Sequence, residues 1–232
     1  MTVKKTQNLA TDFWEETIYS QGRHLNLYPF DAVVSFIFRW RPREKALGET
    51  NVLEIGCGAG NNLWFAAREG FQVAGIDGSP TAISFARKRF ALETLVGDLR
   101  VGNFLELPWG NDTADLGIDR CSTTCVGFQG QKVAVEEMRR VLRPGGMFFF
   151  NGYSEEHTSA RSGEPLQDGR IANIHSGTLV GVGALGFNSK SQIEMLFENG
   201  WEILKLEHLA SRDFSPQGTG IHAEWRVVTR KK

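Results

Sequence analysis

A chain of 232 residues with 41% hydrophobic and 23% charged side chains has the composition of one globular domain. Its net charge of −1 gives no general attraction to nucleic acid, and the basic clusters at 87–89 and 230–232 are interpreted as solvated surface. The N-terminus lacks an apolar signal core, and no stretch approaches the ~18 apolar residues of a membrane span. We therefore expect a cytoplasmic protein that binds neither nucleic acid nor membranes.

Three cysteines, Cys57, Cys121 and Cys125, form no CxxC pair and have no nearby histidine cluster, so reduced thiols and no metal site are expected. A catalytic thiol at Cys121 or Cys125 is an alternative, but the sequence shows no activating base.

The first 48 residues predict two helices, at 12–20 with Thr11 as the cap and at 31–40 with Asp31 as the cap. Trp14 is interpreted as packing between helix and sheet. Three polar-tipped residues near the intervening loop either reach a substrate pocket or pack in the same way. They are Tyr19, Arg23 and Tyr28.

The segment 51–64 predicts a buried strand, a glycine loop and a helix, with Gly56, Gly58 and Gly60 in the loop. Alternate glycines let a ligand lie against bare backbone and the amide groups that open the helix. The spacing differs from the dinucleotide pattern G-x-G-x-x-G because position 61 is Asn. Glu54 would repel a phosphate and favours a cationic ligand instead.

A second apolar strand, 73–77, ends in Asp77, 21 residues after Gly56, close to the ~20 expected of a carboxylate that binds ribose hydroxyls. A fourth strand at 114–120 and a Pro-Gly-Gly turn at 144–146 before Met147-Phe148-Phe149-Phe150 complete the pattern. In their joint order over about residues 50–152, these motifs resemble the class I S-adenosylmethionine-dependent methyltransferases. The resemblance implies S-adenosylmethionine as cofactor and S-adenosylhomocysteine as product.

The resemblance also implies roles for individual residues. Asp77 would bind the ribose, Asn103 would contact the adenine in place of the commoner Asp, and the end of the fourth strand would face the methyl group. The cofactor-binding residues expected in this way are Glu54, Gly56, Cys57, Gly58, Gly60, Asn61, Asn62, Asp77, Gly78, Asn103, Phe104, Asp119 and Arg120. Asp119 and Arg120 can hold an acceptor, or they can form an internal ion pair.

Residues 152–188 form a long polar segment, rich in glycine and serine, that follows the fifth strand. Long loops at the carboxyl ends of parallel strands are where α/β folds place substrates, so we interpret this segment as a substrate lid. His157 is the preferred general base, with Asp119 or Tyr153 as substitutes, and the alternative is a hydrogen-bonded loop histidine. The expected substrate-binding residues are Tyr19, Arg23, Tyr28, Arg120, His157 and Arg161.

A helix at 192–199 and an antiparallel hairpin of strands 201–211 and 221–230 end the chain, and His208 and His222 are expected to be structural. The predicted fold is α/β: a doubly wound, seven-stranded, mostly parallel sheet with an antiparallel last strand and helices on both faces. We expect one methyltransferase domain with an N-terminal helical cover (1–48), a cofactor-binding core (49–151), a lid (152–188) and a C-terminal helix and hairpin (189–232).

The predicted function is methyl transfer from S-adenosylmethionine to an O, N or S atom of a small molecule, mainly by proximity and alignment. Absence of a (Asn/Asp/Ser)-Pro-Pro-(Tyr/Phe) motif and of a Pro-Cys dipeptide at the fourth strand disfavours nucleic-acid methylation. The alternatives are a non-catalytic S-adenosyl-ligand-binding or partner module and a nicotinamide-dependent oxidoreductase. The chain is expected to be a monomer or a homodimer.

Overall fold

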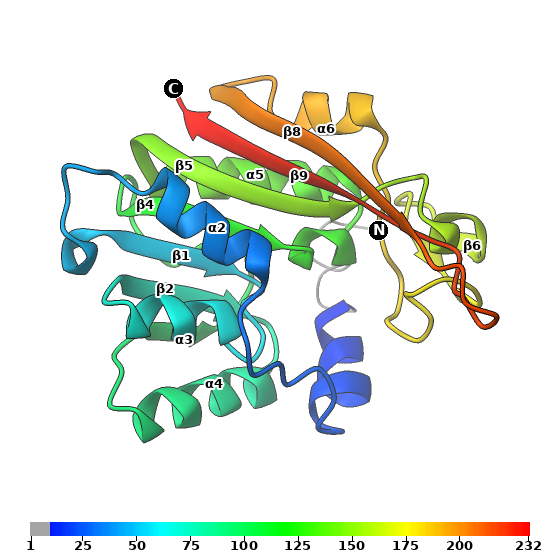
Figure 1. The fold of residues 1–232 in the computed structure, drawn as a ribbon, viewed down its shortest axis with the longest axis horizontal. Coiled ribbons are helices and arrows are strands. Elements are labelled where there is room, and N and C mark those ends of the chain that lie inside the picture. Colours follow the sequence, from blue (N-terminus) through cyan, green and yellow to red (C-terminus); the bar gives the residue numbers. More distant parts are fainter. Residues whose placement is uncertain (1–9) are drawn as a thin grey trace.

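A computed structural model describes residues 10–232, which form a seven-stranded sheet in the order β3-β2-β1-β4-β5-β9-β8 (Figure 1). The strands are β1 (Asn51–Ile55), β2 (Gln72–Asp77), β3 (Asp98–Val101), β4 (Ala114–Arg120), β5 (Leu142–Tyr153), β8 (Trp201–Arg212) and β9 (Ile221–Lys231). The pairs among β1 to β5 are parallel, whereas β9 pairs antiparallel with both β5 and β8. The prediction of a mostly parallel sheet with an antiparallel last strand is confirmed.

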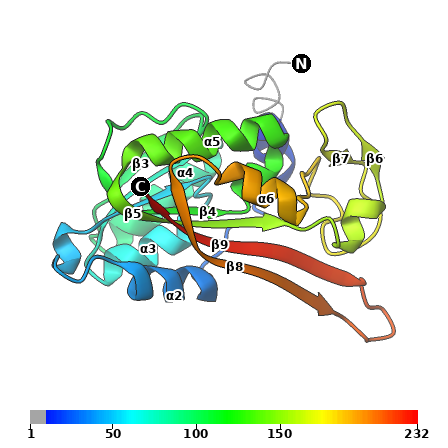
Figure 2. The same ribbon diagram turned by 90° about the horizontal axis from the view of Figure 1, so that it is seen from above.

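Helices cover both faces of the sheet (Figure 2). They are α2 (Asp31–Trp40), α3 (Asn61–Arg68), α4 (Pro80–Leu92), α5 (Phe128–Val141) and α6 (Lys190–Leu196). Side chains of α2, α3 and α4 share one buried cluster, and those of α5 and α6 share the other. Because successive strand residues face opposite sides, Phe148 and Phe150 join the α5 and α6 cluster, while Phe149 packs on Phe36 of α2.

Several predicted helix boundaries are corrected by the structure. Asp31 is the first helical residue of α2 and not its cap, because Phe30 holds the extended capping position. The crossover helix α5 begins at Phe128, three residues before position 131, where its apolar periodicity predicts a start. The last helix, α6, ends at Leu196 and starts from a capping box in which Ser189 and Gln192 bond each other's backbone N–H groups.

The first described helix continues from residue 10 into a π-helical segment, η1 (Trp14–Tyr19). It packs against α4 at the carboxyl edge of the sheet, and residues 1–9 of the predicted helical cover lie outside the described part of the chain. Beyond β5, the predicted lid contains η4 (Thr158–Arg161) and the short pair β6 (Glu164–Pro165) and β7 (Ile171–Ala172). Among residues 10–232, no helix is long and apolar enough to cross a membrane.

Candidate active site

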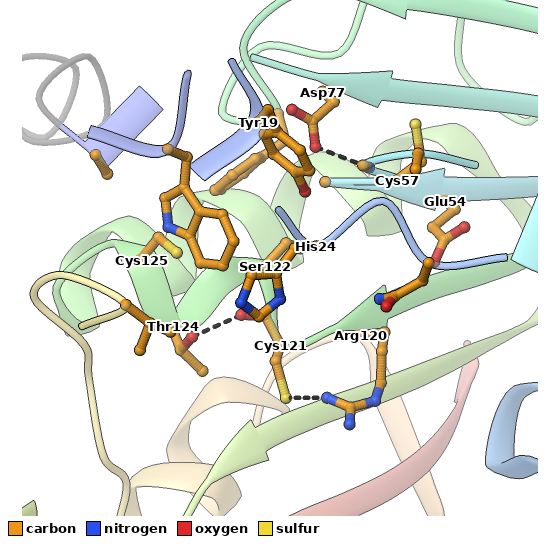
Figure 3. A pocket seen from close by; sticks show the side chains of 18 of the residues that line it. Tyr19, His24, Glu54, Cys57, Asp77, Arg120, Cys121, Ser122, Thr124 and Cys125 are labelled. Carbon is orange, nitrogen blue, oxygen red and sulfur yellow. Dashed lines mark hydrogen bonds between the residues drawn. The ribbon is translucent and has the colours of Figure 1, made fainter. Parts of the chain in front are cut away.

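A cavity of about 420 Å³ lies beyond the carboxyl ends of β1, β2, β4 and β5 (Figure 3). Its walls come from the N-terminal cover, from β1 with the glycine loop, from the ends of β2 and β5, from the segments after β3 and β4, and from the lid. A volume of this size is typical of a small-molecule site, and its place follows the rule that parallel α/β sheets bind ligands beyond their carboxyl edge.

Two glycines of the loop after β1 line the cavity, and the third does not. Gly56 and Gly58 have φ values of +59° and +52°, in the left-handed region that favours glycine. A Cβ on Gly58 would lie 2.7 Å from the hydroxyl of Tyr19, which covers the loop. Gly60 is instead a packing residue, since a Cβ there would come within 2.9 Å of Ala86 on α4.

Asp77, at the end of β2, fixes the glycine loop while lining the cavity. Its carboxylate accepts hydrogen bonds from the backbone N–H groups of Gly58 at 2.9 Å and Ser79 at 2.8 Å. Burial raises the pKa of Asp77, although both backbone bonds favour the ionised form. Each oxygen has one protein partner and retains a lone pair with which to accept from a ligand hydroxyl.

Glu54, on β1, is a buried carboxylate with one oxygen free. Its Oε1 accepts from the side-chain amide of Asn62 at 2.7 Å, whereas Oε2 has no hydrogen-bond partner among the described residues. Burial raises the pKa of Glu54 to about 8, despite the bond from Asn62. An unpartnered buried acceptor at a cavity wall fits a ligand that carries an ammonium group.

Asn61 and Asn62 tie the glycine loop to the N-terminal cover. The Asn61 side-chain amide donates to the carbonyl of Tyr28 at 2.8 Å, and the Asn62 side-chain oxygen accepts from the backbone N–H of Phe30 at 3.0 Å. Both asparagines line the cavity, as does Cys57.

Of the two residues predicted to lie near the adenine, one lines the cavity and the other does not. Phe104 lines the cavity, while Asn103 lies outside its lining and accepts from the backbone N–H of Leu105 at 2.7 Å. Gly78 is also outside the lining, because its Cα faces the Thr11 side chain.

The two polar residues that end β4 have different surroundings. Asp119 is fully buried outside the cavity lining, and its carboxylate accepts bonds from the backbone and hydroxyl groups of Ser122 and Thr123. Asp119 therefore holds the turn after β4 and does not line the cavity. The internal Asp119–Arg120 ion pair that the sequence left open is absent within residues 10–232.

Arg120 does line the cavity and forms no direct ion pair within the described residues, although the Glu224 and Glu54 carboxylates interact with it at longer range. Its guanidinium lies 4.3 Å from the ring centroid of Phe30 and donates to the sulfur of Cys121 at 2.6 Å. Burial raises the pKa of Cys121 and of Cys125 to about 12, so these two cavity cysteines are thiols and not thiolates at neutral pH.

Of the three residues predicted to reach the pocket from the cover, only Tyr19 does. Tyr28 is 77% exposed, and Arg23 is also exposed outside the cavity lining. The cover instead contributes Trp14, which the sequence interpretation assigned to packing, and His24, whose ring meets the indole edge-on at 5.6 Å.

The lid predictions also divide. Tyr153 lines the cavity, whereas Arg161 is exposed and lies outside the lining. His157 is 0% exposed and is absent from the cavity wall, so the prediction that it contacts the acceptor is not supported by the structure. Thr178 lies at the wall instead, with its hydroxyl oxygen 3.0 Å from Nε2 of His157.

The cavity residues that the sequence interpretation missed lie in loops or in short π-helical or 3₁₀ segments. They include Trp14, His24, Phe30, Thr124, Thr178, Leu179, Val182 and Leu185. His24 carried one usable signal, its place beside Gly22 and Arg23 in the interhelical loop, but nothing in the sequence gives the direction of its side chain.

Comparison with known proteins agrees with this geometry. Residues 52–146 match the model of a methyltransferase domain family. The human thiol S-methyltransferase TMT1B is 33% identical over 45% of this chain and 43% of its own length. The malonyl-[acyl-carrier protein] O-methyltransferase of Erwinia pyrifoliae is 30% identical over 53% of this chain and 45% of its own length. The chain thus spans less than half the length of these curated relatives.

A solved structure supports the fold. The S-adenosylmethionine-dependent methyltransferase from Methanosarcina mazei superposes with a TM-score of 0.66 at 16% identity, covering 88% of this chain and 99% of that chain.

Proposed function

We propose that this chain, which belongs to the class I S-adenosylmethionine-dependent methyltransferases, transfers a methyl group from S-adenosylmethionine to an O, N or S atom of a small molecule. One observation carries the proposal. A single cavity joins the glycine loop, Asp77 and the unpartnered oxygen of Glu54 to a second wall made of the cover and the lid. The first wall suits the cofactor, and the second suits an acceptor of limited size.

The residues of the first wall fit the cofactor that the family uses. Asp77 would accept from ribose hydroxyls, Phe104 would pack on the adenine, and Glu54 would pair with the ammonium of the methionine part. When bound, S-adenosylmethionine supplies a methyl group already activated by its sulfonium, so alignment is the main task left to the protein. Gly56 and Gly58 serve that alignment by letting the ligand approach the backbone.

The second wall favours an acceptor with an apolar body and a polar group. Trp14, Phe30 and Leu179 supply apolar surface, while Arg120 supplies a cation that forms no direct ion pair among residues 10–232. A net charge of −1 gives no general attraction to a nucleic acid, which supports a small molecule over RNA. A cytoplasmic location and a monomeric or homodimeric state remain predictions from the sequence.

The first experiment measures thermal stability with S-adenosylhomocysteine, S-adenosylmethionine, NAD and no ligand. A ligand at ~100 times its Kd adds about 2.7 kcal/mol to the free energy of unfolding. We expect stabilisation by both S-adenosyl ligands and none by NAD. Stabilisation by NAD alone would contradict the cofactor assignment.

Turnover is the second readout, because a ligand-binding module without activity would pass the stability test. Radiolabelled S-adenosylmethionine is incubated with a library of hydroxyl, amine and thiol compounds, and methylated product is extracted. Binding of the S-adenosyl ligands with no product from any acceptor class would favour the non-catalytic module.

A further inference from the structure

Two histidine side chains contact the hydroxyl of Thr178 at the lid edge of the cavity. The Thr178 oxygen lies 2.8 Å from Nδ1 of His222 and 3.0 Å from Nε2 of His157, and these two ring nitrogens are 3.1 Å apart. On β9, Glu224 follows two residues after His222 and so faces the same side of the strand, with Oε2 3.7 Å from Nε2 of His222. The Glu224 carboxylate, the His222 imidazole and the Thr178 hydroxyl therefore form a chain of contacts that leads to the cavity.

The protonation of His157 follows from its other nitrogen. Nδ1 of His157 accepts a hydrogen bond from the backbone N–H of Ser159 at 2.9 Å, so Nδ1 carries no proton. A neutral imidazole then has its proton on Nε2, which points at Thr178 and His222. Burial lowers the pKa of His157 to about 4, in keeping with a neutral ring. His157 is thus a fixed donor and cannot take a proton without breaking its bond to Ser159.

The same contacts orient His222. If Nδ1 of His222 carried the proton, that N–H would face the N–H of His157, and the bare Nε2 would face the Glu224 carboxylate. The opposite tautomer removes both repulsions: Nε2–H points to Glu224, and Nδ1 accepts from the hydroxyl of Thr178. Burial alone would raise the pKa of Glu224, but His222, Arg120 and Arg226 lower it to about 2, so it stays ionised.

The position of these groups connects the cavity with solvent. Thr178 lines the cavity, and the side chain of His222 is 33% exposed. The other charged or titratable groups around His222 are Arg226, which pairs with Glu224 at 2.6 Å, and Tyr153, whose ring meets the imidazole edge-on at 6.0 Å. Neither group interrupts the direct contact between Nδ1 of His222 and the hydroxyl of Thr178.

We propose that Thr178, His222 and Glu224 form the path by which the acceptor loses its proton, and that the acceptor atom is a hydroxyl oxygen. This inference rests on the proposed methyl transfer. The acceptor oxygen forms a bond to the methyl carbon as the carbon–sulfur bond breaks, and the sulfur keeps that electron pair. The acceptor proton passes to the oxygen of Thr178 while the proton of Thr178 passes to Nδ1 of His222. The resulting imidazolium is stabilised by Glu224 and releases its proton to water.

A hydroxyl is the acceptor class that needs such a path. A phenolic hydroxyl with a pKa of about 10 stays protonated at pH 8 and gains from general-base assistance. A thiol ionises close to neutral pH and can react as a thiolate without a base. His157 contributes by donating to the oxygen of Thr178, which makes it a positioning residue.

The tautomers can be tested without an acceptor. We would record ¹⁵N spectra of histidine-labelled protein bound to S-adenosylhomocysteine, assigning the five histidines by substitution. Protonated Nε2 and bare Nδ1 are expected for both His157 and His222, and Thr178→Val should shift the Nδ1 signal of His222. A proton on Nδ1 of His222 would overturn the proposal, whether or not any acceptor is found.

The function of the path is tested with two probes that differ by one atom, 4-methylphenol and 4-methylbenzenethiol, at pH 8. Thr178→Val and His222→Gln should lower kcat for the phenol about 100-fold, with far smaller losses for the thiol, and Thr178→Ser should restore most of the activity. His208→Gln is the matched control, because His208 lies on the same hairpin and bonds Ser154 at 2.8 Å. Equal losses for both probes would overturn the proposal.

The experiments distinguish a wrong proton path from a wrong assignment of the methyltransferase function. The variants are designed to leave S-adenosylhomocysteine affinity unchanged, measured by calorimetry, because none of the substituted residues contacts the glycine loop in the described structure. A parent chain that binds no S-adenosyl ligand would refute the methyltransferase function itself. If neither probe is methylated, the measurement of the histidine tautomers alone tests the proposed proton path.

Discussion

The two walls of the cavity are built in different ways. The proposed cofactor wall comes from β1, the glycine loop and the end of β2, elements close in the chain, and the backbone N–H of Gly58 bonds the Asp77 carboxylate directly. The acceptor wall is assembled from the cover, the turn after β4 and the lid, so that Trp14 and Thr178 meet the same cavity although they are far apart in the chain. Substitutions in the first wall should therefore change the affinity for the S-adenosyl ligand, whereas substitutions in the second should change the choice of acceptor and the transfer of its proton.

The largest expected effect comes from Asp77→Ala. Each hydrogen bond to a charged group contributes about 1.5–3 kcal/mol, and two ribose hydroxyls depend on this carboxylate in the proposed complex. We expect S-adenosylhomocysteine affinity, measured by calorimetry, to fall about 100-fold or more. Asp98→Ala is the control, since Asp98 pairs with Arg100 outside the cavity lining. Similar losses in both variants would show that the cofactor wall is elsewhere.

Asp119→Ala should act on stability, because the buried carboxylate holds the turn that carries Arg120 and Cys121 into the acceptor wall. Leaving the donors of Ser122 and Thr123 unpaired is expected to cost about 3 kcal/mol in the free energy of unfolding, measured by urea denaturation. Glu136→Ala is the control, as Glu136 forms an exposed pair with Arg139 on the surface of α5. Unchanged stability with lost turnover would instead restore Asp119 as a catalytic residue.

Glu54→Gln should separate stability from binding. The folded-state pKa of Glu54 is about 8, above its ordinary value of 4.5, so the ligand-free chain loses stability progressively as pH rises from 4.5 to about 8. Glutamine does not ionise, so the variant should be more stable than the parent at pH 9, by about 2 kcal/mol in chemical denaturation. S-adenosylhomocysteine binding at that pH should weaken about tenfold, because the ammonium loses a carboxylate partner.

Glu202→Gln provides the control for Glu54, since Glu202 is a half-exposed surface carboxylate paired with Arg230. It should change neither property. Equal stability of Glu54→Gln and the parent at pH 9 would contradict the raised pKa of Glu54.

The smallest effect is expected from a pair of tyrosines in the cover. Tyr19→Ala removes a ring that covers Gly58 at the cavity and should raise KM for S-adenosylmethionine about fivefold, or about 1 kcal/mol. Tyr28→Ala should leave KM unchanged, because its side chain is 77% exposed and only its backbone carbonyl is used, by Asn61. Equal effects would mean that the cover does not approach the cofactor as described.

Most of the residues that the sequence assigned to the cofactor line the cavity, whereas few of those that it assigned to the substrate do. Glu54, Asp77 and Phe104 follow strands whose burial pattern is legible, so their positions at the carboxyl edge could be inferred from chain order. Asn103 has the expected position, but its side chain bonds the next turn of its own loop, a choice that depends on local backbone angles. Arg23 and Tyr28 were likewise expected at the cavity but lie outside its lining, because the direction of a loop side chain depends on local backbone angles.

By itself, the sequence determined the order of strands and helices, the glycine loop and the acid after β2, because hydrophobic periodicity and glycine spacing are properties of short contiguous segments. Only the tertiary structure decided which loop side chains meet at the acceptor wall. His157 and His222 are 65 residues apart, and their 3.1 Å contact across Thr178 depends on how the lid folds back onto β9. Such contacts arise from packing between distant segments, for which a single sequence carries no local signal.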